Sequence, residues 1–250
     1  MRKALAVTVL AGSLGLGGCV TMDVNSAVNV GATAMKAMSL TDGEVLAMSN
    51  QSCEAMDAQN KIAPAKNKYT TRLNRVVAKM PKEIDGKKAV YKVYLTPDVN
   101  AWAMANGCIR VYSGLMDLMN DDELRGVLGH EIGHVALGHS KKRMQTAYAA
   151  SAARQLAAQS SSATVAALTR SQAGDLGEKF LNAQFSQSQE LEADSYSFDL
   201  LTRLKLERKG LVTSFQKLSK ISGGDSSLLS SHPGSDDRAQ RMQDRLDGKK

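Results

Sequence analysis

Two histidines in the middle of the chain constrain its fold more than any other feature. His130 and His134 enclose Glu131 in the run His-Glu-Ile-Gly-His. Residues four apart lie on the same face of an α-helix, so the two imidazoles can bind one metal ion. Glu131 projects from the adjacent edge, toward the position where a water would be held. The spacing therefore predicts a helix that carries part of a hydrolytic zinc site.

The residues around this motif also indicate a helix. Segment 120–123, Asn-Asp-Asp-Glu, offers capping side chains and early acidic charge. A motif that fixes only three residues also arises by chance, but the chain has only four histidines. Metal binding is therefore favoured over a coincidental match. Apolar residues then recur at roughly helical intervals, at Leu124, Val127, Leu128, Val135 and Leu137.

The N-terminus is typical of an exported lipoprotein. Arg2 and Lys3 precede an apolar stretch, 4–16, which is too short for a permanent membrane helix but suits a secretory signal. The run Leu16-Gly17-Gly18-Cys19 resembles a bacterial lipobox, in which the signal is cut before the cysteine and the cysteine carries the lipid. Because Val20 follows in place of Asp, the resemblance to Gram-negative lipoproteins points to the outer membrane. A chance cysteine after small residues is the alternative.

We therefore expect three parts: a removed signal at 1–18, a lipidated tether at 19–40, and one domain at 41–250 that faces the periplasm. Loss of Arg2 and Lys3 with the signal lowers the formal charge from +7 to +5. The remaining basic residues are scattered among acidic ones, without a basic stripe and interleaved aromatics. Nucleic-acid binding is therefore poorly supported.

If Cys19 carries lipid, Cys53 and Cys108 are the cysteines that remain. A pair in an exported protein most simply forms one disulfide, because the periplasm is oxidising, and two buried free thiols are the alternative. Closing a loop of this length would stabilise the fold by roughly 3 to 5 kcal/mol in the chain-entropy model. The disulfide is the favoured interpretation.

Three further segments have the composition of helices. Thr41 and Glu44 have the spacing of a capping box at the start of the first, and the second covers 69–79 and ends before Pro81. The third, 146–173, is rich in Ala, Ser and Gln, which permits a helix but offers little large apolar surface. It is either a lid over the cleft or a plain surface helix, and the sequence leaves both readings open.

Strand patterns lie between these helices. Residues 88–96 alternate in strand fashion, and Asn106-Gly107 predicts a tight type I′ turn between strands at 101–104 and 108–112. An extended peptide could pair through backbone hydrogen bonds with a candidate edge strand. That strand comprises Asn100, Ala101, Trp102, Ala103 and Met104. We therefore expect one α+β domain, mostly helical, with a small sheet.

A catalytic zinc site needs a third protein ligand besides its solvent position. His139 lies five residues beyond His134, so a continuing helix turns it away from the shared face of the histidine pair. In the run Glu190-Leu191-Glu192-Ala193-Asp194, the first and last carboxylates share a helical face, and Glu192 points about 200° around from Glu190. A solvated acidic face is the alternative. Paired with the histidine motif, this run is the favoured source of the missing ligand.

Taken together, His130-Glu131-x-x-His134 and Glu190-x-x-x-Asp194 resemble the gluzincin metallopeptidases related to HtpX and the CaaX prenyl proteases. The likeness extends over essentially the whole mature chain. It implies a zincin-like (minigluzincin) domain whose small β-sheet carries an edge-strand hairpin. It also implies Glu190 as the third zinc ligand and Asp194 as the residue that supports a ligand from behind.

The family also carries a His-Pro pair with an Arg six residues after the His, and His232-Pro233 precedes Arg238 at that spacing. The resemblance implies that His232 and Arg238 line the cleft and bind the oxyanion of the tetrahedral intermediate. In some relatives the histidine instead reaches the zinc and holds the enzyme inactive. Without the resemblance, His232-Pro233 reads as a turn before a polar C-terminal helix.

The combined expectation is an endopeptidase with one zinc ion, in which Glu131 acts as general base. Backbone pairing at an edge strand depends little on the side chains of the substrate, so unfolded or misassembled envelope proteins are the expected substrates. Envelope proteases or assembly factors are further candidate partners. An assembly factor or chaperone is the rival, with its peptidase latent because His232 occupies the open zinc position. A structural zinc site with four permanent protein ligands is a third reading.

Overall fold

The computed structural model describes residues 39–158, 168–221, 227–232 and 235–249. The predicted signal, the lipobox with Cys19 and nearly all of the predicted tether lie outside these residues, as does Pro233. Within the described ranges, no helix is long and apolar enough to cross a membrane. This part of the chain is mostly helical with two small sheets, which confirms the predicted α+β class.

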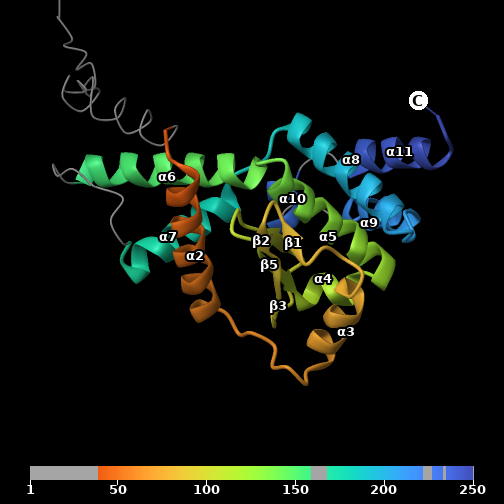
Figure 1. Ribbon diagram of the computed structural model, residues 1–250, viewed down its shortest axis with the longest axis horizontal. Coiled ribbons are helices and arrows are strands. Elements are labelled where there is room, and N and C mark those ends of the chain that lie inside the picture. The colour runs from red at the N-terminus through yellow and green to blue at the C-terminus, as the bar shows by residue number, and fades with distance from the viewer. Residues whose placement is uncertain (1–38, 159–167, 222–226, 233–234, 250) are drawn as a thin grey trace, which may run out of the picture.

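A three-stranded sheet lies between two groups of helices (Figure 1). Its strands are β3 (Val90–Tyr94), β5 (Cys108–Tyr112) and β4 (Ala101–Ala103), in that spatial order. β5 is parallel to β3 and antiparallel to β4. A separate hairpin, β1 (Glu83–Ile84) and β2 (Lys87–Lys88), precedes β3. The strand predicted over 88–96 is therefore shorter than expected.

One of the two hairpin turns was not predicted, and the other differs from the sequence-based expectation. Asp85 and Gly86 both have positive φ, 49° and 71°, and form the two-residue turn between β1 and β2. Between β4 and β5, Gly107 has a φ of 80° and its N–H donates to the Met104 carbonyl. The predicted type I′ turn at Asn106-Gly107 is thus wrong, because a three-residue loop with glycine in the left-handed region connects these strands.

Side chains alternate across the sheet, so its two faces pack against different helices. Helix α9 (Lys209–Leu218) packs on α5 (Asp121–Ala136). The α5 face of the sheet meets α5 and α3 (Lys68–Val77). It presents Val93, Ala101, Ala103, Ile109 and Val111. The α2 face meets α2 (Asp42–Gln59), α6 (His139–Ala158) and α7 (Arg170–Asn182). It presents Tyr94, Trp102, Met104, Cys108 and Tyr112.

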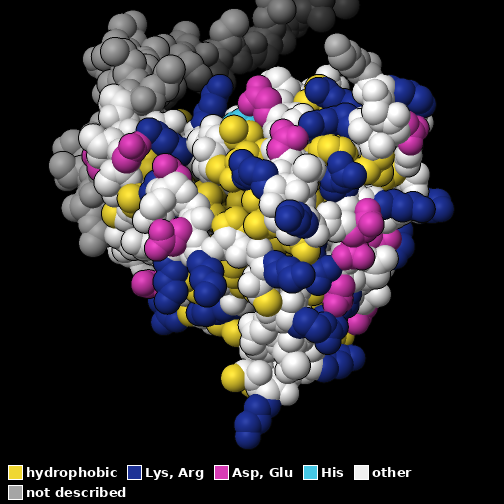
Figure 2. All heavy atoms as spheres, turned by 45° about the vertical axis from the view of Figure 1, so that its right-hand side comes forward, with side chains coloured by type: hydrophobic (Ala, Val, Ile, Leu, Met, Phe, Trp, Pro, Cys, Tyr) yellow, Lys and Arg dark blue, Asp and Glu magenta, His cyan; other side chains and the backbone are white. Residues whose placement is uncertain are grey.

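The remaining helices complete the α5 side. Helices α8 (Gln187–Arg203) and α11 (Ser235–Leu246) lie near α5 and α9, as Figure 1 shows. Two short helices, α4 (Ser113–Leu118) and α10 (Ser227–Ser231), connect longer elements. On the face shown in Figure 2, basic side chains lie among acidic and apolar ones, as the sequence indicated.

The predicted helices are present, with small shifts at their ends. Thr41 caps α2, and both bonds of the predicted capping box with Glu44 are formed. α3 begins at Lys68 and ends at Val77, before Pro81. In the segment 146–173, α6 continues to residue 158 and α7 begins at residue 170. The described part of α6 packs along α7 and α2, where Lys179 Nζ donates to Ser151 Oγ at 3.0 Å.

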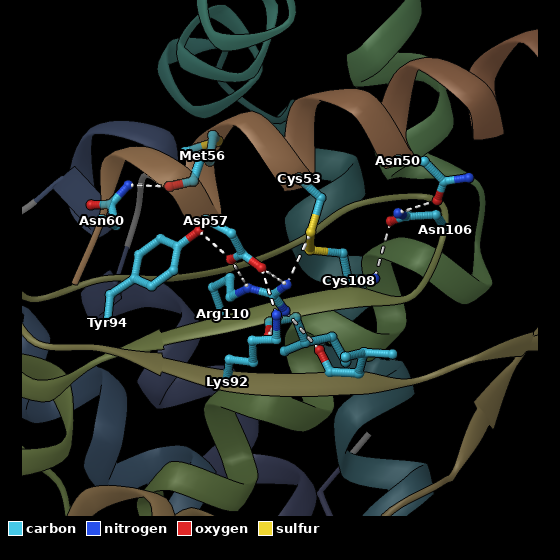
Figure 3. The surroundings of a disulfide bond; sticks show 12 residues. Asn50, Cys53, Met56, Asp57, Asn60, Lys92, Tyr94, Asn106, Cys108 and Arg110 are labelled. Carbon is cyan, nitrogen blue, oxygen red and sulfur yellow. Dashed lines mark hydrogen bonds and ion pairs between the residues drawn. A yellow bond between two sulfur atoms is a disulfide. The ribbon is translucent and has the colours of Figure 1, made fainter. Parts of the chain in front are cut away.

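A disulfide joins α2 to β5 and confirms the predicted pairing of Cys53 with Cys108 (Figure 3). Beside it, buried Arg110 Nε lies 2.7 Å from Asp57 Oδ1, and Lys92 Nζ lies 2.7 Å from Asp57 Oδ2. Although burial opposes it, the hydrogen bonds from Arg110 and Lys92 lower the pKa of Asp57. The α2 face is therefore held by a covalent bond and a charged cluster.

Candidate active site

Helix α5 carries the histidine motif and begins where the sequence predicts. Asn120 Oδ1 accepts hydrogen bonds from the backbone of Asp122 and Glu123, at 3.0 and 2.9 Å. Glu123 Oε2 accepts from Asn120 N at 2.8 Å, which completes a capping box. Three turns of buried helix follow, and they bring the motif into the protein interior. The three polar residues of the motif, His130, Glu131 and His134, are at most 3% exposed.

Glycines on α5 allow α8 to pack unusually close. A Cβ at Gly129 would lie 2.5 Å from Ser197 Oγ, and one at Gly133 would lie 3.1 Å from the Ala193 carbonyl oxygen. This approach places Glu190, in the first turn of α8, opposite the two histidines. Sequence reasoning missed the role of these glycines, although their helical spacing is a visible signal.

The two motif histidines and Glu190 converge on one point. His130 Nε2 and His134 Nε2 are 2.9 Å apart. Glu190 Oε1 lies 3.3 Å from His134 Nε2, and Glu190 Oε2 lies 3.6 Å from His130 Nε2. The structure therefore brings together the three residues expected to bind the metal, although they are remote in sequence.

His232 joins the same cluster. Its Nδ1 lies 3.0 Å from Glu190 Oε1 and 3.2 Å from His130 Nε2. With His134, these residues have candidate ligand atoms that all lie within 4.8 Å of one another. His232 follows α10, and its N–H donates to the Leu228 carbonyl at 2.9 Å. In this structure His232 thus stands where a fourth metal ligand would stand.

Asp194 and Arg238 support the cluster from behind. Asp194 Oδ1 lies 2.8 Å from His130 Nδ1. Arg238 Nε and Nη2 donate to the Asp194 carboxylate at 2.8 and 2.7 Å, and Nη1 lies 2.6 Å from Glu190 Oε2. Although burial opposes it, the hydrogen bonds from Arg238 lower the pKa of Asp194. Each guanidinium nitrogen of Arg238 meets a carboxylate here, and its oxyanion role stays a prediction.

Glu131 is a buried carboxylate beside these donors. Its Oε1 has no hydrogen-bond partner among the described residues, and His232 Nε2 lies 3.6 Å away. Burial raises the pKa of Glu131 above its ordinary value, although the neighbouring His232 and His130 oppose this. A carboxyl group with raised proton affinity, close to a metal site, is suited to act as a general base.

The position of His139 corrects the sequence-based picture, whereas that of Glu192 agrees with it. The prediction that His139 faces away from the histidine pair assumed a continuing helix, but α5 ends at Ala136 and Gly138 has a φ of 74°. His139 Nδ1 therefore approaches His134 Nδ1 to 3.1 Å, on the side of the ring away from Glu190. Glu192 lies outside the donor cluster, as predicted, and its Oε2 is 3.0 Å from His139 Nε2.

Two further residues next to the site were not found from the sequence. The Phe185 ring stacks on the His134 ring, with centroids 3.6 Å apart and an interplanar angle of 10°. The guanidinium of Arg143, on α6, lies 4.3 Å from the Phe185 ring centroid, and Nη2 donates to the Leu181 carbonyl. Burial lowers the pKa of Arg143 to about 10. No local pattern signals Phe185, because its partner is 51 residues away.

The candidate edge strand is largely covered. β4 pairs only with β5 among the described strands, so it does lie at a sheet edge. Residues 100–104 are nevertheless all buried, and Ser140 Oγ donates to the Ala103 carbonyl at 2.9 Å. Substrate pairing with this strand therefore stays a prediction.

The donor chemistry fits a zinc ion. Both Nδ1 atoms of His130 and His134 are hydrogen-bonded from behind, so both Nε2 lone pairs point at one place, which a cation favours. Two ligands of one tetrahedral zinc, each at ~2.1 Å, lie about 3.4 Å apart. The separations among the three expected ligands, 2.9, 3.3 and 3.6 Å, are close to that value. Two imidazoles with one carboxylate are also a common catalytic zinc set.

A helix-borne histidine pair, a carboxylate from a second helix and a buried glutamate define a metallopeptidase site on a small α+β domain. The model of peptidase family M48 matches residues 66–246. Metalloprotease LoiP from Escherichia coli (strain K12) is 49% identical over 98% of this chain and 96% of its own. Metalloprotease YcaL from the same organism is 49% identical over 90% of this chain and 89% of its own. Protease HtpX from Shewanella baltica (strain OS195) is 39% identical over 26% of this chain.

The chain therefore belongs to peptidase family M48. This confirms the predicted likeness to the HtpX-related metallopeptidases and the prediction of a metalloendopeptidase.

Proposed function

We propose that this metallopeptidase is a zinc endopeptidase that degrades unfolded or misassembled cell-envelope proteins at the periplasmic face of the outer membrane. The convergence of His130, His134 and Glu190 beside buried Glu131 carries the catalytic part of this proposal. The lipobox at Cys19 supports the location. The substrate class rests on the expectation that backbone pairing at residues 100–104 selects only weakly among substrate sequences.

The protein side chains divide the catalytic work. His130, His134 and Glu190 hold the metal, and Asp194 fixes the orientation of the His130 imidazole. When bound, zinc lowers the pKa of a water to about 7 and polarises the scissile carbonyl. Glu131 accepts the proton of the attacking water and passes it to the leaving amine nitrogen. Loss of this proton transfer costs a factor of roughly a hundred to ten thousand in rate.

His232 has two roles in this proposal. Within reach of the ligand set, as here, it closes the site. Released from Glu190, its imidazole can donate a hydrogen bond to the oxyanion, together with Arg238 as the resemblance implies.

Casein digestion by the purified protein from residue 20 onward tests the enzymatic proposal. We expect zinc-loaded protein to fragment casein, and we expect a chelator or Glu131→Gln to abolish this. Casein that stays intact under every zinc-loaded condition contradicts the proposal. Membrane fractionation of the full chain and of Cys19→Ala tests the location, because only the lipidated form should sediment with outer membranes.

An envelope assembly factor or chaperone with a latent peptidase remains the second candidate, and one observation favours it. The Nδ1 atom of His232 lies 3.0 Å from Glu190 Oε1, in the place of a fourth ligand. If this candidate is right, Glu131→Gln keeps all cellular activity of the protein. His232→Ala then exposes proteolysis that the unaltered protein lacks.

A further inference from the structure

The two metal-binding histidines are supported from behind by different groups. Behind His130 stands Asp194, which is fully buried and paired with Arg238. Behind His134 stands a second imidazole, that of His139, with Nδ1 atoms 3.1 Å apart. Carboxylates and carbonyls usually support zinc-binding histidines, so an imidazole in this position needs its own explanation.

Hydrogen-bond chemistry fixes the tautomers of this second arm. When His134 turns Nε2 to the metal, its Nδ1 carries the proton and must donate it. His139 Nδ1 is the atom within reach, so it accepts and the His139 proton lies on Nε2. His139 Nε2 lies 3.0 Å from Glu192 Oε2, to which it donates. Every donor and acceptor in this line is therefore satisfied with a neutral His139.

The fold holds His139 in this position. The left-handed conformation of Gly138 ends α5 and starts α6 at His139, so the His139 ring turns back onto His134. The next residue, Ser140, anchors α6 to the Ala103 carbonyl. His139 is 6% exposed, whereas the Glu192 side chain is 59% exposed. The arm therefore runs from the buried ligand to the protein surface.

We propose that His139 and Glu192 form a hydrogen-bonded relay that positions His134 as a metal ligand. His139 acts through His134 and is a positioning residue, with Glu192 as the acceptor that fixes its tautomer. The inference rests on the proposed function, since it concerns the same zinc site. It also makes the two arms unequal, because one ends at a buried ion pair and the other at a carboxylate open to solvent.

Zinc affinity, measured by competition with a chromogenic chelator, tests the relay. His139→Phe keeps the ring but removes the acceptor, and we expect it to weaken zinc binding ~10- to 100-fold. His139→Asn places an amide oxygen near the lost Nδ1, so it should restore affinity to within ~3-fold of the unaltered protein. Glu192→Gln keeps an acceptor for His139 and should cost less than ~3-fold. Asp199→Asn, on the same helix and 60% exposed, is the matched control without effect.

The visible absorption spectrum of the cobalt-loaded protein gives a second readout, because it reports ligand geometry. We expect an altered spectrum for His139→Phe and a normal one for His139→Asn and Asp199→Asn. If His139→Phe does not fold, His139→Ala replaces it in the comparison with His139→Asn.

Two results would overturn the relay, and a third would contradict the proposed function instead. Unchanged zinc affinity and cobalt spectrum in the folded variant that lacks an acceptor overturn it. An Asn variant as weak as the Phe variant also overturns it, because the acceptor atom then does not matter. Absence of tight zinc binding by the unaltered protein contradicts the proposed function itself, and the two failures are thereby distinguished.

Discussion

The α5 face and the α2 face of the sheet are fixed by different chemistry. On the α5 side, helix glycines let α5 and α8 approach closely, and the candidate metal-binding residues of the two helices converge there. On the α2 face, a disulfide and the Asp57–Arg110 pair hold a layer of aromatic and sulfur-containing side chains. The metal-site cluster thus lies on the α5 side and the covalent cross-link on the α2 face, so replacing a polar side chain of the cluster should spare the cross-linked layer, and removing the cross-link should spare the metal site.

Glu131→Gln should have the largest effect on activity and almost none on stability. The substitution removes the general base but keeps the size of the side chain and adds no charge. Peptidase activity should fall by a factor of roughly a hundred to ten thousand. The midpoint of thermal unfolding, measured by circular dichroism, should stay within a few degrees. A variant that unfolds much earlier would show that the active-site face also carries global stability.

Replacing Cys53 and Cys108 together by Ala should have the opposite result, with stability lost and zinc binding kept. The bond closes a loop between residues 55 apart, so the chain-entropy model predicts a loss of about 4 kcal/mol in the free energy of unfolding. Urea denaturation measures this loss. Zinc affinity of the folded variant should remain within ~2-fold, because neither cysteine contacts the donor cluster. Loss of zinc binding in the folded variant would show that the cross-linked face also shapes the metal site.

Gly129→Ala tests whether close helix packing supports the metal site. The added Cβ would lie 2.5 Å from Ser197 Oγ, so α5 and α8 must separate slightly or Ser197 must move. We expect a loss of about 1–3 kcal/mol in stability, together with weaker zinc binding. Gly43→Ala in the first turn of α2 is the control, since its Cβ meets nothing closer than 4.0 Å. Equal behaviour of the two variants would contradict the packing argument.

The Asp57 cluster should make the stability of the α2 face depend on pH. Because the folded protein lowers the pKa of Asp57, its contribution is present above the ordinary value of 3.8 and is lost as the pH falls through the lower folded value. Asp57→Asn should therefore cost about 1–3 kcal/mol near neutral pH and progressively less below pH 3.8. Denaturation of both proteins between pH 3 and 7 tests this. If the difference in free energy of unfolding between the two proteins is constant over this range, the charge of Asp57 does not contribute to stability.

The sequence predicted the parts of the site that depend on helical spacing. The cap at Asn120 and the His130–His134 pair need only local geometry, so both were found correctly. Glu190 lies 56 residues beyond His134 and was identified because its run matched a known family pattern. His139 lies outside the ligand cluster, as predicted, but its place behind His134 was missed because the prediction extended α5 beyond its end, although Gly138 is a typical helix-ending residue.

Long-range partners could not be predicted from the sequence. Arg110 was placed on the correct strand, but nothing local shows that it meets Asp57 on α2 or that it is buried. Phe185 lies on the loop before α8 and stacks on His134 only because α8 packs against α5. The turn at Asn106-Gly107 was predicted wrongly for a simpler reason. Asp85-Gly86 is as strong a type I′ signal as Asn106-Gly107, and only the first pair adopts that turn.

The bond between Cys53 and Cys108 closes a covalent ring that contains β1 to β4 and the loops between them. A single backbone cut anywhere from residue 54 to residue 107 would leave both fragments tethered to each other. Such a nicked chain would migrate as one band on a gel until it is reduced.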